Sequence, residues 1–293
     1  MKRGISFPLI LGHEGAGIVE SVGGAVRSLR SGDRVACTQW TETCGRCRFC
    51  RTNREPLCAE RKFFGHDRDG TYAEYFKIQE DSLLPLPASI PFGEGAILSC
   101  AVGTVLAAIR DVGARRPAST SWSPAPAAAS GRTPSRWPSS AAPSSSPRRR
   151  RPRRWRSCAP RGTDEVVVAR DGAFADEVRR RARGEGVDVV CDNVGAPVFA
   201  EALRATARGA RSVLVGELTG DTVTFNTARL FLKGVSLLST TSTSRTQLAD
   251  TIALVGAGKL RPLVTERFPF DEAPRVHRLM VEKKLQGRVL LVP

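Results

Sequence analysis

The sequence has no long apolar run and few aromatic residues. No stretch approaches the ~18 consecutive apolar residues of a membrane-spanning helix, and residues 1–8 lack the apolar core of a signal peptide. Hydrophobic residues make up 41% and charged residues 25% of the 293, which excludes a wholly disordered chain, a collagen and a coiled coil. We therefore expect a cytoplasmic protein of about two domains with no membrane partner.

One segment, residues 115–161, lacks Val, Ile, Leu, Met, Phe and every acidic residue. It consists mostly of Ala, Ser, Pro and Arg, and it holds twelve of the arginines and nine of the 19 prolines. The formal net charge of the whole chain is +16, but without these arginines it falls to +4. The basic character of the protein therefore belongs to this segment alone.

Two interpretations of residues 115–161 remain open. The composition is typical of a disordered linker or basic arm inserted into a fold. Alternatively, the segment is a double frameshift. When the last base of each codon is joined to the first two of the next, Thr120 to Gly131 permits an aliphatic strand followed by a Gly-rich turn, which is how a dinucleotide-binding domain begins. Under both interpretations the chain as given has no Gly-x-Gly-x-x-Gly.

Nucleic-acid binding through Arg148–Arg156 is a third possibility for this segment, but no nucleic-acid-binding motif accompanies the charge. We therefore expect no nucleic-acid partner. Steeply salt-dependent binding to DNA would contradict this expectation.

Four of the eight cysteines form one run with the spacing C-x2-C-x2-C-x7-C: Cys44, Cys47, Cys50 and Cys58. Four thiolates on a short loop suit a closed, tetrahedral zinc site, which stabilises a lobe and has no open position for a reaction. An iron–sulfur cluster can have a similar spacing, and a set of unrelated buried cysteines is the simplest alternative. Four nearby arginines, Arg46, Arg48, Arg51 and Arg54, would partly offset the negative charge of a zinc–tetrathiolate centre.

A second set of candidate ligands is scattered along the chain. His13 and Glu14 follow an apolar stretch, and Cys100 precedes an apolar helix. One His, one carboxylate and one Cys could hold an open, catalytic zinc. By spacing alone this prediction is weak, since a lone His-Glu on a turn is more often structural.

Several motifs outside residues 115–161 resemble the zinc-containing medium-chain alcohol dehydrogenases. They are the cysteine run and the stretches Phe7–Gly17, Gly32–Val35, Gly70–Tyr75, Leu98–Ala101, Val187–Gly195 and Gly287–Leu291. The resemblance implies an α/β protein with a GroES-like, β-rich catalytic domain and a Rossmann domain, which is a doubly wound parallel sheet that binds NAD or NADP. It also implies hydride transfer between this cofactor and a small alcohol or carbonyl substrate, and a homo-oligomer that is a dimer or a tetramer.

Site residues carried over by motif are His13, Glu14 and Cys100 for a catalytic zinc, and the four-cysteine run for a structural zinc. The chain begins a few dozen residues later than the family pattern, so the family's first catalytic-zinc cysteine is missing. Because the pyrophosphate loop is also missing, we expect the chain as given to be a poor catalyst.

The resemblance places the catalytic domain at residues 1–103, completed by 260–293, and the Rossmann domain at 104–259, with 115–161 expected to be disordered. Because the ends of parallel strands line the cofactor site, Asn193, Val215 and Gly216 are candidates to contact the nicotinamide. Packing alone is the alternative role for these three residues.

Two other functions remain open. The Cys100–Thr104 and Ser239–Arg245 stretches are compatible with a reductase of an activated double bond, resembling acryloyl-CoA reductases. A non-catalytic, zinc-stabilised remnant of the fold belongs to a different functional class.

Overall fold

The structure is a computed structural model. It describes residues 6–114, 120–123, 129–131, 141–143, 167–169, 172–282, 284–285 and 287–293. The chain folds into two compact units, one of Met1–Gly103 with Thr241–Pro293 and one of Thr104–Thr240. We call them unit 1 and unit 2. Most of the 115–161 segment lies outside the described residues. Within those residues, no helix has the length and apolar character needed to cross a membrane.

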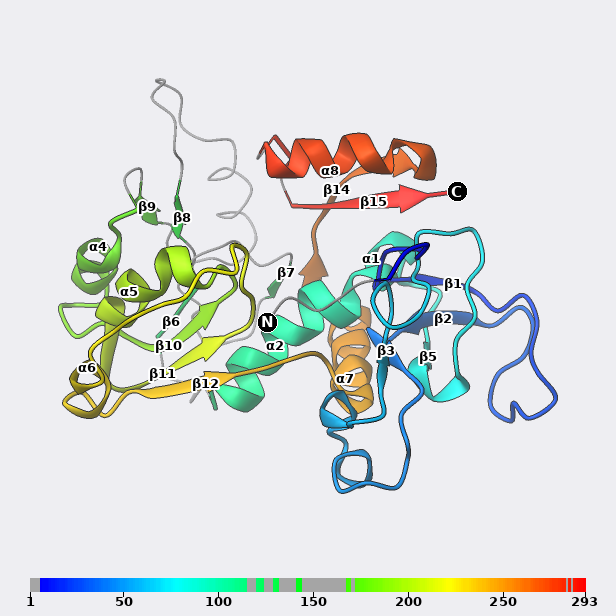
Figure 1. Cartoon of the computed structure of the whole chain (residues 1–293), viewed down its shortest axis with the longest axis horizontal. Coiled ribbons are helices and arrows are strands. Elements are labelled where there is room, and N and C mark those ends of the chain that lie inside the picture. Colours follow the sequence, from blue (N-terminus) through cyan, green and yellow to red (C-terminus); the bar gives the residue numbers. More distant parts are fainter. Residues whose placement is uncertain are drawn as a thin grey trace. The chain divides into compact units, whose positions relative to one another are not determined.

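Unit 1 is rich in short strands and single helical turns (Figure 1). Its strands are β1 (Ala16–Ile18), β2 (Arg34–Cys37), β3 (Trp40–Thr41), β4 (Lys62–Phe63), β5 (Leu83–Pro85), β13 (Leu260–Pro262), β14 (Val264–Pro269) and β15 (Arg288–Val292). Its α-helices are α1 (Phe92–Ala96), α7 (Arg245–Gly256) and α8 (Ala273–Val281). The 3-10 helices are η1 (Cys50–Thr52), η2 (Glu55–Leu57), η3 (Glu80–Ser82) and η7 (Phe270–Glu272), and a π-helix, η4, covers Leu98–Thr104.

Three sheets form within unit 1. An antiparallel sheet has the order β1-β2-β5, β3 pairs with β4 antiparallel, and β14 pairs with β15 parallel. The three-stranded sheet buries Val35, Cys37 and Leu83 together with Leu29. The two antiparallel sheets, formed by β1 to β5, are consistent with the GroES-like domain that the sequence implies.

Unit 2 is built on a parallel sheet (Figure 1). Its strands are β6 (Ser121–Trp122), β7 (Ala129–Gly131), β8 (Ala141–Pro143), β9 (Val167–Ala169), β10 (Val187–Asp192), β11 (Thr206–Leu214) and β12 (Ser236–Ser239). Its helices are α2 (Val105–Ala107), the π-helix η5 (Ala108–Val112), α4 (Ala175–Arg181), α5 (Ala196–Ala205) and α6 (Ala228–Phe231).

Four of these strands form one sheet with the order β12-β11-β10-β6, and every pair in it is parallel. Neighbouring residues on the central strand β10 belong to different cores: Val190 packs with Trp122 and Val198, and Cys191 packs with Ile109. Since successive side chains point to opposite faces of a strand, both faces of this sheet are covered. The α/β fold class, with GroES-like and Rossmann parts, is confirmed.

Two details add to the expectations from sequence. The two compact units divide at residues 240/241, whereas the sequence places the proposed domain boundary near 260. The segment before α7 contacts unit 1, where the Trp40 indole N–H donates to the Thr243 carbonyl at 2.9 Å. Within the segment expected to be disordered, Trp122 lies in β6, is 2% exposed and has its ring centroid 4.4 Å from that of Phe174. The segment contains no Val, Ile or Leu, but the large apolar ring of Trp122 can fill a core position in their place.

Candidate metal and cofactor sites

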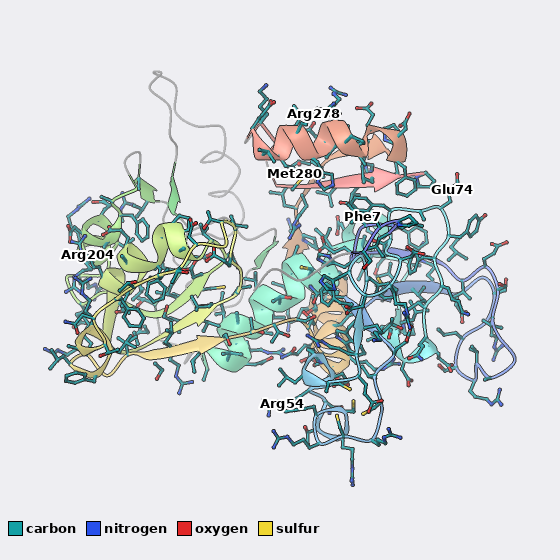
Figure 2. All side chains as sticks on the ribbon, in the orientation of Figure 1. Phe7, Arg54, Glu74, Arg204, Arg278 and Met280 are labelled. Carbon is teal, nitrogen blue, oxygen red and sulfur yellow. The ribbon has the colours of Figure 1, made fainter. Side chains whose placement is uncertain are left out.

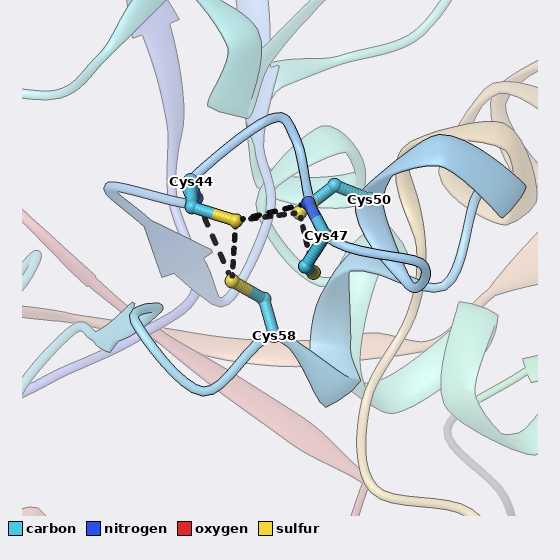
Figure 3. Close-up of side chains that lie close together, drawn as sticks. All are labelled: Cys44, Cys47, Cys50 and Cys58. Carbon is cyan, nitrogen blue, oxygen red and sulfur yellow. Dashed lines mark hydrogen bonds between the residues drawn. The ribbon is translucent and has the colours of Figure 1, made fainter.

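Four cysteine sulfurs meet on one loop of unit 1 (Figure 3). The Sγ atoms of Cys44, Cys47, Cys50 and Cys58 all lie within 4.8 Å of one another. Three pairs of sulfurs lie within hydrogen-bonding distance. The Sγ–Sγ separations are 3.6 Å for Cys47 and Cys50, 3.7 Å for Cys44 and Cys58, and 3.9 Å for Cys44 and Cys50. A zinc–sulfur bond of ~2.3 Å places the corners of a tetrahedron about 3.8 Å apart. The four thiols therefore have the spacing of a zinc–tetrathiolate centre.

The local backbone explains how a short loop gathers these sulfurs. Gly45 and Asn53 adopt positive φ angles of 69° and 55°, which turn the chain sharply. The Cys47 amide donates to the Cys44 sulfur at 3.3 Å, and the Cys44 amide lies 3.5 Å from the Cys58 sulfur. Hydrogen bonds from the Cys50 amide lower the pKa of the Cys47 thiol to about 7. Such bonds favour the thiolate form that binds metal.

The geometry separates the alternatives for this cysteine run. All four cysteines are free thiols. In a four-iron cluster each cysteine binds a different iron, which holds the sulfurs farther apart than the ligands of a single ion. The observed spacing therefore favours one zinc over a cluster and excludes a set of unrelated cysteines.

The four arginines near the run are exposed, as Arg54 illustrates in Figure 2. The guanidinium groups of Arg48 and Arg54 lie 4.6 and 5.5 Å from the centre of the Phe49 ring. Arg46 pairs with Glu60 at 3.4 Å. These cations therefore lie at the surface of the lobe, where solvent screens their effect on the metal charge.

His13 and Glu14 lie on the loop before β1. Burial lowers the pKa of the His13 imidazole, which keeps the ring neutral and able to act as a metal ligand. The two oxygens of Glu14 are already engaged: one accepts from the Ala101 amide at 3.1 Å, and the other pairs with Arg288 at 3.4 Å. Glu14 is thus the acceptor side of an ion pair.

Cys100 lies on the π-helix η4, next to the amide that Glu14 holds. Burial raises the pKa of the Cys100 thiol to about 12, and the charges of Glu14 and Arg288 also act on it. The three predicted catalytic ligands therefore share one neighbourhood in unit 1. Among the residues that the structure describes, however, only the cysteine run brings three or more metal-binding atoms together. The ligand types suit zinc, but the donor atoms of His13, Glu14 and Cys100 do not converge on one point.

Arg288 was missed as a functional residue by sequence reasoning. It belongs to β15, and its charge acts on His13, Cys100 and Tyr72 as well as on Glu14. The signal was present, because Gly287–Leu291 is one of the motifs behind the resemblance. A sequence motif shows which residues match the family, but it does not show that the Arg288 side chain pairs with Glu14.

In unit 2, the three predicted cofactor-contact residues lie at the carboxyl ends of β10 and β11. The amides of Val215 and Gly216 both donate to the Asp192 carbonyl, at 2.8 and 3.3 Å. A Cβ on Gly216 would lie 2.9 Å from the Asn193 carbonyl oxygen. The structure thus brings Asn193, Val215 and Gly216 together, and a side chain at position 216 would collide with the backbone.

Two carboxylates at the same edge were also missed. One oxygen of Asp192 accepts from the Val194 and Gly195 amides at 2.9 Å each, and Glu217 accepts from the Ala196 amide at 2.8 Å. Burial raises the pKa of Asp192. The Asp-x-x-Gly after an apolar strand was the available signal for this turn, since such side chains bond to amides further along the chain.

A pocket of about 410 Å³ adjoins this edge. Its lining is mostly apolar and includes Val215, Gly216, Glu217, Phe199, Phe225 and Leu237. This hollow lies beside the residues expected to meet the nicotinamide.

Two family models match the chain: the alcohol dehydrogenase GroES-like domain over residues 1–88 and the zinc-binding dehydrogenase over residues 161–291. An alcohol dehydrogenase of Geobacillus stearothermophilus is 27% identical over 97% of this chain and 83% of its own length. An acryloyl-coenzyme A reductase of Metallosphaera sedula is 26% identical over 98% and 84%. The crystal structure of an NAD-dependent alcohol dehydrogenase superposes with a TM-score of 0.86 at 30% identity, over 99% of this chain and 84% of that one.

Proposed function

The chain belongs to the zinc-containing medium-chain alcohol dehydrogenase family, and we propose which of its residues carry the function. The protein is a zinc-dependent, alcohol dehydrogenase-like oxidoreductase that uses NAD or NADP. Its substrate is a small molecule. The observation that carries the residue assignment is the tetrahedral spacing of the four cysteine sulfurs.

Cys44, Cys47, Cys50 and Cys58 are proposed to hold the structural zinc, and His13, Glu14 and Cys100 the catalytic zinc. A zinc ion in the second site would stabilise negative charge on the substrate oxygen. A neutral His13 would supply an uncharged nitrogen ligand, and the Glu14 carboxylate is paired with Arg288. Since the donor atoms do not converge, loading this second site requires the side chains to move.

Asn193, Val215 and Gly216 are proposed to position the nicotinamide ring. The lack of a side chain at Gly216 lets its backbone approach that of Asn193 closely, and the Asp192 carbonyl accepts from the Val215 and Gly216 amides. A fixed turn at the ends of parallel strands orients the ring for hydride transfer. A nicotinamide held there would supply or accept the hydride.

We propose that cofactor binding is impaired in this chain. The sequence contains no Gly-x-Gly-x-x-Gly, so the glycine-lined helix start that normally accepts the pyrophosphate is missing. Full-rate turnover of an alcohol with NAD or NADP by this polypeptide would contradict this proposal.

Reduction of an enoyl thioester is the alternative activity, supported by the similarity to an acryloyl-coenzyme A reductase. The two activities can be distinguished by their substrates. Enoyl-thioester reduction would consume NADPH in the presence of an enoyl thioester, whereas alcohol oxidation would reduce NAD or NADP in the presence of an alcohol. If neither reaction proceeds but zinc is bound, the protein is a non-catalytic remnant.

We also propose that the protein acts as a homo-oligomer in a reducing compartment such as the cytoplasm. The outer strand β12 has a sheet partner on one side only in the described structure, and Phe231 and Leu232 just before it are 70% and 65% exposed. A free strand edge with apolar neighbours suits pairing with a second copy. Thiolate ligands need reducing conditions. Light scattering measures the number of copies.

Zinc analysis tests the structural site. Cys47→Ser removes one ligand at a half-exposed position, and we expect the variant to lose one zinc per chain and to melt at a lower temperature, since a zinc–thiolate site contributes directly to folding. Elemental analysis and calorimetry measure both. Cys37→Ala is the matched control, because Cys37 is a buried thiol outside the run. Equal zinc content in Cys47→Ser and the parent would contradict the assignment.

A further inference from the structure

Three cations gather in unit 2 at the end of α5 and the starts of β11 and β12. They are Arg179 on α4, Arg208 near the start of β11 and Lys233 just before β12, and we call them the basic end. Arg204, labelled in Figure 2, is on the last turn of α5 beside them. None of the three was assigned a ligand-binding role above.

Hydrogen bonds to backbone carbonyl oxygens position these three side chains near one another. The Lys233 ammonium donates to the Thr206 carbonyl at 3.0 Å, and the Arg179 guanidinium donates to the same oxygen at 3.4 Å. Arg208 donates to the Leu232 carbonyl at 3.2 Å, directly before Lys233 in the chain. The Gly209 amide bonds to the Lys233 carbonyl at 2.7 Å and fixes this turn against β11. Three elements therefore deliver positive charge to one place.

The positive charge at the basic end is not neutralised. In the described part of the chain, Arg179, Arg208 and Lys233 make no ion pair with a carboxylate, whereas neighbouring Arg204 is taken up by Asp176 and Glu201. The carboxyl end of helix α5 contributes only about half a negative charge. Partial burial, followed by the charges of Arg179, Arg208 and Arg204, lowers the pKa of Lys233. A negatively charged group bound here would reduce the repulsion among these three positive side chains.

We propose that the basic end binds a phosphate-bearing anion. Guanidinium groups match the oxygens of a phosphate with paired N–H donors, and an ammonium adds a point charge. Donors remain for this, because Lys233 uses two of its three N–H groups and the arginines keep N–H groups beyond those bonded to carbonyls. A doubly charged anion with several oxygens suits three cations from three directions better than chloride does.

This site is separate from the nicotinamide edge. Thr206 and Leu214 at the two ends of β11 pair with Val187 and Asp192 on β10, which lie five residues or ~16 Å apart at ~3.3 Å per residue. The basic end is at the start of β11 and Glu217 lies beyond its finish. One cofactor phosphate therefore cannot serve both places. The inference does not depend on the proposed function, and a protein without dehydrogenase activity could still bind the anion.

Calorimetric titration with inorganic pyrophosphate at constant ionic strength tests the proposal. We expect Lys233→Met and Arg208→Gln each to weaken binding by about tenfold or more, and Lys233→Arg, which keeps the charge, to restore most of it. Lys259→Met removes an exposed lysine in unit 1 and should leave the affinity unchanged. Circular dichroism without anion checks that each variant folds.

Two results would overturn the proposal: pyrophosphate binding by Lys233→Met that equals the Lys259→Met value, or no binding to the parent beyond the effect of sodium chloride. A second titration with adenosine diphosphate identifies the source of the phosphate. Stronger, Lys233-dependent binding of the nucleotide supports a nucleotide ligand, and equal or weaker binding supports a free phosphate compound.

Discussion

Glu217 is an exposed side chain whose charge is fixed by its neighbours. Its carboxylate accepts from the amides of Ala196, Thr219 and Gly220 and from the Thr219 hydroxyl, at 2.8–3.1 Å. These bonds, with that of Ala196 the largest, lower its pKa from 4.5 to about 2. The residue thereby joins the end of β11 to the first turn of α5, where a negative charge is favoured.

A pH dependence follows from this shift. Since the folded-state pKa lies below the unfolded value, the stabilisation is complete above pH 4.5 and is lost as the pH falls toward 2. We expect Glu217→Gln to melt below the parent at pH 6 and the gap to narrow steadily below pH 4.5. Calorimetric scans of both proteins from pH 6 to pH 3.5 measure it. A gap that stays constant across this range would show that charge plays no part.

The residues themselves were predicted to different degrees. The cysteine run could be assigned from sequence because its ligands lie within 15 positions and one loop gathers them. His13 and Cys100 are 87 positions apart, so their meeting depends on tertiary packing that a motif reports only by resemblance. Asp192, Glu217 and Arg288 were missed because acidic and basic residues are common on surfaces, and only hydrogen-bond partners single them out.

Helix α7 begins with a reciprocal cap. The Ser244 hydroxyl accepts from the Gln247 amide at 3.2 Å, and the Ser244 amide donates to the Gln247 side chain at 3.0 Å. Just before it, the Gln39 side chain accepts from the Thr243 amide at 3.3 Å. The Gln39 contact ties the residue before this cap to the rest of unit 1. Apolar periodicity alone carries no information about which unit a helix serves.

Removing this cap should destabilise unit 1. We expect Ser244→Ala to cost about 1 kcal/mol of unfolding free energy, because the Gln247 amide at the helix start loses the hydroxyl oxygen that accepts from it. Urea denaturation followed by circular dichroism measures the change. Thr246→Ala, at an exposed position in the first turn of the same helix, is the control and should change stability by less than about half as much. Equal effects of the two substitutions would show that the cap is not the cause.

For the whole molecule, the fold could be predicted better from the residues outside 115–161 than from those within this segment. Strand β10 was recognisable because most of its residues are apolar, as in buried parallel strands. Strand β11 carries two arginines and gives a weaker signal. Trp122 shows the limit of a composition argument, since a segment without aliphatic residues still places one ring in the core of unit 2. The helices of unit 2 and the parallel order of its sheet follow from the rest of the chain, which keeps the family pattern.

The two interpretations of residues 115–161 predict different cofactor affinities. Replacing this segment with the polypeptide encoded in the shifted frame, which permits a Gly-rich turn after an aliphatic strand, should strengthen NADH or NADPH binding by on the order of tenfold or more, because backbone amides at a helix start then meet the pyrophosphate. Fluorescence titration of both cofactors against the parent and the replacement measures this. Deletion of residues 148–161 with a short Gly-Ser linker is the control, since it removes eight of the twelve arginines without adding the turn and keeps strand β6 with Trp122. A replacement that binds no better than the deletion would mean that the segment is a true insertion, and that the loss of cofactor affinity has another origin in the chain.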